Sequence, residues 1–189
     1  ESWSEANTGL TYADMGRLGL AAAASHPDML YAIIAANADA QGVYRSTDFG
    51  GTWEKRSSYM TSSPQYYNEI IVDPKNSDRL YALNTFTMKS EDGGKSFDAL
   101  SSQWRHVDDH ALWIDPNNTQ HLYIGGDGGI YESWDRGATW RHLRNLSITQ
   151  FYRIQPDYVE PFYNVCGGTQ DNNTLCGPSR TTNVHGITN

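Results

Sequence analysis

A dense group of ionisable side chains lies at His106, Asp108, Asp109 and His110. If this segment is extended, His106, Asp108 and His110 point to one side and Asp109 to the other, because side chains alternate along a strand. Two imidazoles and one carboxylate on the same side would suit a divalent metal ion. The alternative is structural, with Asp109 and His110 joining neighbouring elements by hydrogen bonds and His106 solvated. No other cofactor is expected from the sequence.

Carboxylates could also perform glycoside hydrolysis, which needs an acid and a base or nucleophile held about 5 to 9.5 Å apart. The catalytic candidates are Asp108, Asp109, Asp127 and Asp171. Aspartate is also common in turns for conformational reasons, so the residue type alone does not establish catalysis.

An octapeptide occurs three times, at 46–53, 90–97 and 133–140. It indicates the strands and turns that hold these side chains in place. All copies read Ser-x-Asp-x-Gly-x-(Ser/Thr)-(Trp/Phe), and an even spacing of about 43 to 44 residues indicates a repeat architecture. The Asp accepts backbone hydrogen bonds in a tight turn, the Gly takes a positive φ, and the aromatic residue anchors the next strand. Structural roles are therefore predicted for Ser46, Asp48, Gly50, Trp53, Ser90, Asp92, Gly94, Phe97, Ser133, Asp135, Gly137 and Trp140.

Each octapeptide follows a strand–turn–strand pattern, as in 67–74 followed by 79–83 and in 111–116 followed by 121–125. Four short strands in about 43 residues form the blade of a β-propeller. The sequence therefore predicts an all-β protein with repeat units at approximately 10–58, 59–100, 101–144 and 145–189, the last incomplete. We expect one domain over 1–189 that supplies about four blades of a larger propeller. Its first partners are then the remaining blades of the parent protein.

Composition restricts the class of partner and the location. The net charge is −8 and the pI is about 5.1, which argues against nucleic acid and anionic membrane partners. No apolar stretch approaches the roughly 18 residues of a membrane span, so membrane insertion is not expected. Cys166 and Cys176 are close enough to form a short disulfide loop, with a pair of free thiols as the alternative. An extracytoplasmic or secreted location is the favoured interpretation.

The octapeptide resembles the Asp-box, or BNR repeat, of sialidases and sortilin-type receptors. The chain as a whole is similar to a group of uncharacterised secreted proteins with sortilin-like, xyloglucanase-like propellers, through segments 16–20, 106–116, 126–131, 145–152 and 167–172. Cys166 and Cys176 depart from the pattern of that group, and this departure suits a local disulfide. Sialidase activity is not expected, because the sequence lacks the Arg-Ile-Pro element and its arginines are scattered.

The resemblance implies a ligand face on the side opposite the octapeptide turns, formed by the loops that lead into each blade and by the second-to-third-strand loops. All four candidate aspartates fall on this face. The predicted binding residues there are Arg17, Tyr66, Tyr67, Trp104, Tyr152, Gln170 and Asn172, among which the aromatic rings could stack on sugars. The expected function is binding or scaffolding, with a peptide or glycan ligand. The alternative is part of a glycoside hydrolase that acts on polysaccharide through paired aspartates.

Overall fold

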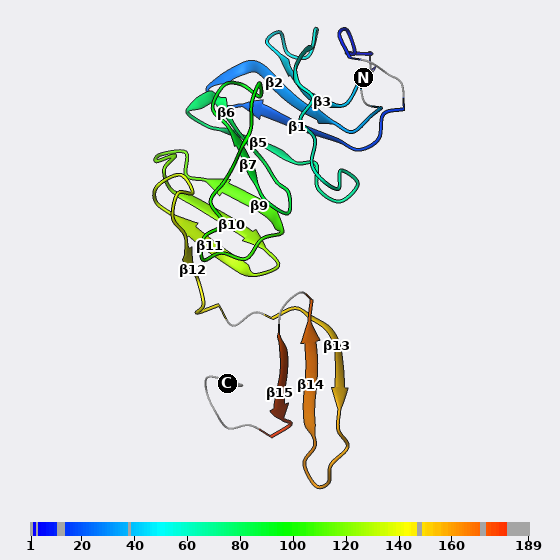
Figure 1. Cartoon of the computed structure of the whole chain (residues 1–189), viewed down its shortest axis with the longest axis vertical. Helices are drawn as coiled ribbons and strands as arrows, with labels where there is room; N and C mark the ends of the chain where they lie inside the picture. The colour runs from blue at the N-terminus through cyan, green and yellow to red at the C-terminus, as the bar shows by residue number, and fades with distance from the viewer. Residues whose placement is uncertain are drawn as a thin grey trace. The chain divides into compact units, whose positions relative to one another are not determined.

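The structure, a computed structural model, describes residues 2, 4–10, 14–37, 39–146, 149–170 and 173–180. The regular structure of these residues is entirely β, with fifteen strands in four antiparallel sheets. The chain divides into two compact units, residues 1–143 and 144–189, which are described separately below (Figure 1). Within the described ranges, no helix has the length and apolar character needed to cross a membrane. The repeat boundaries expected from the sequence stay predictions.

The first unit contains three four-stranded sheets, each a meander in which consecutive strands pair. Blade 1 consists of β1 (Leu18–Ala23), β2 (His26–Ile34), β3 (Gly42–Ser46) and β4 (Glu54–Ser57). Blade 2 consists of β5 (Ile70–Asp73), β6 (Asn76–Ala82), β7 (Met88–Ser90) and β8 (Asp98–Ala99). Blade 3 consists of β9 (Asp109–Ile114), β10 (Leu122–Gly126), β11 (Gly129–Ser133) and β12 (Arg141–His142). The predicted all-β class and the partial propeller are confirmed.

Two clusters of the hydrophobic core of this unit lie between blades, because each sheet carries apolar side chains on both faces. Between blades 1 and 2 the buried residues are Ala23, Tyr31, Ile33, Val43, Ile70, Val72 and Leu80. Between blades 2 and 3 they are Tyr81, Leu100, Ile114, Leu122, Ile124 and Tyr131. Neighbouring residues such as Ile70 and Ile71 therefore contribute to different cores, as the alternation of a strand requires.

Each octapeptide forms a turn that satisfies its own polar groups. In the first copy, the Ser46 hydroxyl donates to Asp48 at 2.7 Å, and Asp48 accepts the Thr52 backbone N–H at 2.8 Å. The glycine N–H donates to the serine oxygen at 2.9, 2.9 and 2.8 Å in the three copies. The hydroxyl and then the backbone N–H of Ser96 lower the pKa of the Asp92 carboxyl, because both hydrogen bonds favour the ionised form. The turns are thus specified by local contacts.

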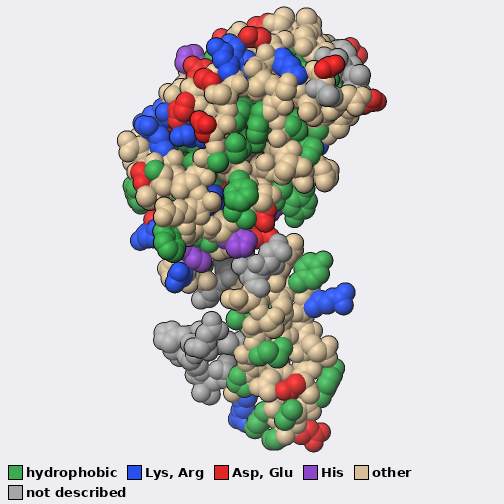
Figure 2. Space-filling view, viewed as in Figure 1, with side chains coloured by type: hydrophobic (Ala, Val, Ile, Leu, Met, Phe, Trp, Pro, Cys, Tyr) green, Lys and Arg blue, Asp and Glu red, His purple; other side chains and the backbone are tan. Residues whose placement is uncertain are grey.

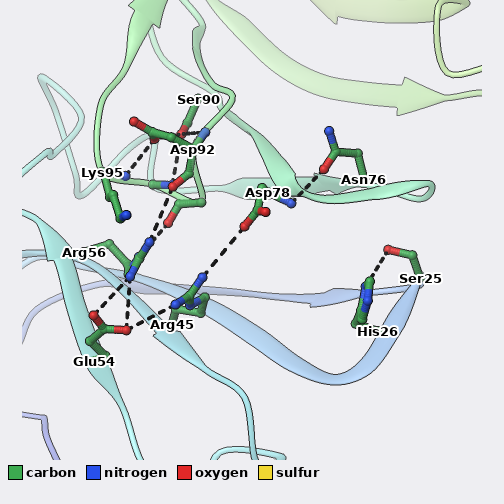
Figure 3. A network of polar contacts seen from close by, with 12 residues as sticks. Ser25, His26, Arg45, Glu54, Arg56, Asn76, Asp78, Ser90, Asp92 and Lys95 are labelled. Carbon is green, nitrogen blue, oxygen red and sulfur yellow. Dashed lines mark hydrogen bonds and ion pairs between the residues drawn. The ribbon is translucent and has the colours of Figure 1, made fainter.

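The turn glycines also face the preceding blade. A Cβ on Gly94, where φ is +82°, would lie 2.8 Å from Val43 Cγ1 of blade 1. A Cβ on Gly137 would lie 2.7 Å from Leu100 Cδ1 of blade 2. The Arg56 Nε of blade 1 donates to the Gly93 carbonyl of the blade 2 turn at 3.0 Å. The Arg56 Nη2 donates to the Asp92 carbonyl of the same turn at 3.5 Å (Figure 3). The turns of blades 2 and 3 therefore each help to join their blade to the preceding one.

The second unit is a three-stranded antiparallel sheet of β13 (Phe151–Pro156), β14 (Asn164–Thr169) and β15 (Thr174–Pro178). Cys166 and Cys176 lie directly opposite each other on β14 and β15 and form a disulfide. Hydrophobic side chains lie at the visible surface of this unit (Figure 2). The exposed ones include Tyr152, Ile154, Tyr158 and Phe162.

A buried carboxylate on β11 makes the stability of the first unit dependent on pH. Glu132 accepts the Tyr123 hydroxyl at 2.7 Å, lies 3.1 Å from His121 Nε2 and is paired with Arg141. The hydrogen bond from Tyr123 is the largest of the contacts that lower the pKa of Glu132 to about 2. A carboxyl whose pKa is lowered on folding contributes its full stabilisation at a pH above its pKa in the unfolded chain, which is about 4.5. That contribution is lost as the pH falls towards the folded-state pKa of about 2.

We therefore expect Glu132→Gln to lower the free energy of unfolding at neutral pH, with a difference from the parent protein that shrinks as the pH falls from about 4.5 towards 2. Urea denaturation over a pH series measures this difference. Glu5→Gln, at an exposed position, is the control and should differ little from the parent at any pH. A constant deficit for Glu132→Gln across the series would contradict the expectation.

Candidate functional site

The segment before β9 does not have the extended geometry that the predicted metal site requires. The φ of Asp108 is +65°, in the left-handed region, so the alternation expected from 106 to 110 is broken there. His106 Nδ1 bonds to the adjacent Val107 carbonyl at 2.7 Å. Among the described residues, no three His, Cys, Asp or Glu side chains are grouped as metal ligands. His106, Asp108 and His110 are therefore not brought together as a ligand set, and metal binding by the protein stays a prediction.

Asp108 instead accepts a hydrogen bond from a tyrosine on the loop that leads into blade 2. The Tyr67 hydroxyl donates to Asp108 Oδ1 at 2.6 Å. Burial raises the pKa of Tyr67 to about 12, and the hydrogen bond to Asp108 acts in the same direction. The phenol therefore stays protonated and keeps donating at neutral pH. This bond joins the loops that lead into blades 2 and 3.

Three aromatic rings gather around this hydrogen bond. The Tyr67 ring stacks on His110 with centroids 5.5 Å apart, and Tyr66 meets both rings edge-on at 5.3 and 5.4 Å. His110 Nε2 lies 3.3 Å from Asp127 Oδ1, in the turn between β10 and β11. Tyr66 is 58% exposed. We call Tyr66, Tyr67, Asp108, His110 and Asp127 the aromatic–carboxylate cluster.

A close backbone approach holds the Asp127 turn against the Asp108 segment. The Asp127 N–H donates to the Asp108 carbonyl at 3.2 Å. A Cβ on Gly126 would lie only 2.0 Å from that carbonyl oxygen, so this position requires glycine. The pairing of β9 with β10 is irregular between Gly125 and Gly126, which turns the strand end towards Asp108.

Arg17 lies beside the loop that carries Tyr66. Its Nη1 donates to the backbone oxygens of Tyr66 at 2.9 Å and Gln65 at 3.2 Å. The Asn68 amide donates to the Arg17 carbonyl at 2.7 Å and the Ile33 carbonyl at 3.1 Å. Through these two bonds Asn68 positions the same loop. Its φ of +128° is a tertiary feature that the sequence does not signal.

Asp109 has surroundings unlike those of Asp108. It is buried, accepts the Thr87 hydroxyl at 2.6 Å and is paired with the buried Arg105 guanidinium. That guanidinium also lies over the Trp140 ring, 5.1 Å from its centroid. Burial raises the pKa of the Asp109 carboxyl against the opposing effects of Thr87 and Arg105. The structure thus places Asp109 in the junction between blades 2 and 3, and leaves Asp108 and Asp127 as the aspartates of the cluster.

The remaining predicted site residues lie on the loop before β9, in the second unit or outside the described residues. Trp104 is 87% exposed, with a φ of +61°, on the loop before β9. In the second unit, Tyr152 and Gln170 line a hollow of about 400 Å³ together with Arg153, Gly168 and Thr169. Asp171 and Asn172 lie outside the described residues.

The arrangement of the cluster suits recognition of a ligand with both flat and polar surfaces. The exposed Tyr66 ring offers an apolar face, and the two carboxylates of the cluster can accept hydrogen bonds from hydroxyl or amide groups. Each carboxylate is held by a partner in the protein, Asp108 by Tyr67 and Asp127 by His110. Such preorganised groups lose little side-chain freedom when a ligand binds.

Comparison with known proteins identifies the architecture. No family model matches the chain, and no curated protein matches it. A GH74 enzyme from Niastella koreensis is similar in structure over 79% of this chain, with a TM-score of 0.55 and 20% identity. The GH74 xyloglucanase from Xanthomonas campestris is similar over 85%, with a TM-score of 0.51 and 18% identity. The structure of YCF48 bound to D1 peptide is similar over 94%, with a TM-score of 0.51 and 14% identity.

The fold is that of a β-propeller segment. At these identities, the similarity establishes the fold alone. This chain spans 25% of the Niastella enzyme, 28% of the Xanthomonas enzyme and 56% of YCF48.

Proposed function

We propose that this chain is a segment of an extracytoplasmic Asp-box propeller that binds a peptide or a glycan at the aromatic–carboxylate cluster. The observation that carries the proposal is the half-exposed Tyr66 ring, set edge-on against Tyr67 and His110, each of which contacts a carboxylate. Exposed aromatic residues beside fixed polar groups are the usual composition of a recognition surface.

The Asp-box assignment and the location are parts of the same proposal. Three octapeptide turns with the same serine, aspartate and glycine hydrogen bonds support membership of the Asp-box, sortilin-like group. The Cys166–Cys176 disulfide supports an oxidising compartment outside the cytoplasm, where such bonds persist.

A second candidate function is glycoside hydrolysis through Asp108 and Asp127. It is favoured by the presence of two carboxylates in one cluster, each held by a different hydrogen-bonding partner. An acid–base pair needs carboxyl groups in unequal environments, and a phenol beside one and an imidazole beside the other meets that need. The two solved enzymes described above carry the GH74 designation, and one is named a xyloglucanase.

The binding proposal predicts that Tyr66→Ala weakens ligand affinity by at least about fivefold, because a stacked aromatic ring contributes about 1 kcal/mol beyond its buried area. Calorimetric titration of the full chain with a xyloglucan oligosaccharide and, separately, with the D1 peptide measures the effect. The ligand that binds the parent protein identifies the class.

The control for that titration is Phe49→Ala, which removes an exposed aromatic ring from an octapeptide turn and should leave the affinity unchanged. Equal affinities for Tyr66→Ala and the parent would contradict the cluster as the binding site. Release of reducing ends from xyloglucan by the parent, lost in both Asp108→Asn and Asp127→Asn, would instead establish the hydrolase.

A further inference from the structure

The aromatic–carboxylate cluster carries an excess of negative charge. Among its five residues, Asp108 and Asp127 each bring a carboxylate, and only His110 can carry a positive charge. The His110 imidazole, which is neutral or singly charged, compensates at most one of the two carboxylates. The nearby guanidinium of Arg17 is matched by its own counter-charge, because Arg17 Nη2 lies 3.7 Å from Glu69 Oε1. The charge of the cluster therefore favours a cationic group on the ligand.

Both carboxylates act on one atom of the cluster, the Tyr67 hydroxyl. Burial is the largest cause that raises the pKa of Tyr67 to about 12, and the charges of Asp108 and Asp127 act in the same direction. Asp108 and Asp127 are half-buried, with the Asp127 side chain 19% exposed. Charges attract more strongly at such positions than in bulk water, because the effective dielectric constant is lower and salt screens less. A cation bound here would therefore be attracted by two carboxylates at once.

The exposed Tyr66 ring suits the same kind of ligand. It stands nearly perpendicular to the stacked rings of Tyr67 and His110, at interplanar angles of 84° and 81°, and is 58% exposed. The face of an aromatic ring carries negative potential and attracts a cation placed over it. A guanidinium is planar, stacks on aromatic faces and pairs with carboxylates through several N–H groups. It therefore matches both the ring and the carboxylates of the cluster.

The donors beside the cluster are engaged by the protein itself. The Tyr67 hydroxyl donates to Asp108 Oδ1, and Arg17 Nη1 donates to the Tyr66 and Gln65 backbone oxygens. An acidic ligand would have to displace these contacts. An ionised carboxylate, in contrast, has about four lone-pair directions, so Asp108 can accept from a ligand and keep its bond from Tyr67.

On the basis of the binding site proposed above, we infer that the aromatic–carboxylate cluster recognises the guanidinium of an arginine side chain in a basic peptide segment. The guanidinium stacks on the exposed face of Tyr66 and donates to Asp108, while Asp127 adds a second counter-charge. The ligand is thereby narrowed from a peptide or a glycan to an arginine-containing peptide. The net charge of −8 favours the approach of such a peptide, because an acidic protein attracts a basic partner.

Two peptides that differ in one functional group test this inference. The full chain, labelled with ¹⁵N, is titrated with acetyl-Gly-Gly-Arg-Gly-Gly-amide and with the same peptide carrying citrulline, and NMR shifts give each affinity. Citrulline replaces the charged guanidinium with a neutral urea of nearly the same shape. It should bind at least about tenfold more weakly, because charge-assisted hydrogen bonds are roughly twice as strong as neutral ones. This comparison uses the parent protein, so it needs no variant to fold.

A matched pair of variants locates the charge that the arginine peptide meets. Asp127→Asn removes one carboxylate charge of the cluster with little change in side-chain shape, and should weaken binding of the arginine peptide about fivefold. Asp98→Asn removes an exposed carboxylate of β8 outside the cluster, and should leave the affinity within about twofold of the parent value. Equal losses in the two variants would overturn the inference, since they would show only a general effect of net charge.

The remaining outcomes separate this inference from the proposed function. Equal affinities of the arginine and citrulline peptides, both lost in Tyr66→Ala, would overturn the inference and leave the cluster as a peptide-binding site. Binding of a xyloglucan oligosaccharide at the cluster without binding of the arginine peptide would overturn it and leave the cluster as a glycan-binding site. If neither peptide nor the oligosaccharide bound, the inference and the proposed function would both be wrong.

Discussion

Asparagine in place of Asp109 is expected to lower the free energy of unfolding by about 3–5 kcal/mol, because it leaves the Arg105 guanidinium buried without a counter-charge. The substitution keeps the shape of the side chain and an oxygen that can accept the Thr87 hydroxyl. The decrease in the free energy of unfolding therefore measures the missing carboxylate charge more than any change in packing. Urea denaturation followed by tryptophan fluorescence measures it.

A double variant tests the physical cause of that loss. Arg105→Met combined with Asp109→Asn leaves no buried charge, so it should recover a large part of the lost stability. Asp108→Asn is the matched control, and it should cost less than about 1 kcal/mol because only the hydrogen bond from Tyr67 is weakened. If Asp109→Asn retained full stability and instead abolished turnover of a polysaccharide, a catalytic role for Asp109 would be established.

Alanine at Gly126 is expected to destabilise the first unit by about 1–3 kcal/mol and to disturb ligand binding at the aromatic–carboxylate cluster. The added Cβ would lie 2.0 Å from the Asp108 carbonyl oxygen. A backbone atom cannot move aside as the end of a flexible side chain can. The Asp127 turn and the Asp108 segment must therefore separate, which changes the relation between the two carboxylates.

Gly125→Ala provides a neighbouring control, since a Cβ there has no heavy atom within 4 Å. This variant should keep the stability and the ligand affinity of the parent within about 0.5 kcal/mol. Both properties can be measured on the same samples by urea denaturation and calorimetric titration. Equal behaviour of the two alanine variants would show that the close approach at Gly126 does not organise the cluster.

The architecture could be predicted from the sequence because its determinants are local. The hydrogen bonds that the conserved serine and aspartate side chains make within an octapeptide turn join residues no more than four positions apart, such as Asp48 and Thr52. The strands are likewise indicated by short apolar runs such as 70–72, which end in an Asp-Pro turn. Repetition of these local signals at an even interval then predicts the series of blades.

The cysteine pair is a feature that the local sequence could not decide. The spacing of Cys166 and Cys176 was compatible with a disulfide or with free thiols. The pairing of β14 with β15 puts the two residues directly opposite each other, where a disulfide forms. The register of two strands decides that outcome, and residue spacing alone does not specify a register.

The sequence by itself therefore determined the all-β class, the blade pattern, the turn residues and the region around Asp108 to His110 as the place to seek a site. Only the tertiary structure decided the role that each side chain there can take. The left-handed φ of Asp108 ended the expected alternation, so Asp108 meets Tyr67, which lies 41 positions away in the chain. Asp109 lies buried in the junction between blades 2 and 3, where it accepts the hydroxyl of Thr87 from blade 2. Turns and strands are specified by residues that are close in the sequence. The burial of a side chain and its hydrogen-bonding partner depend instead on which blade packs against it, and that blade is distant in the sequence.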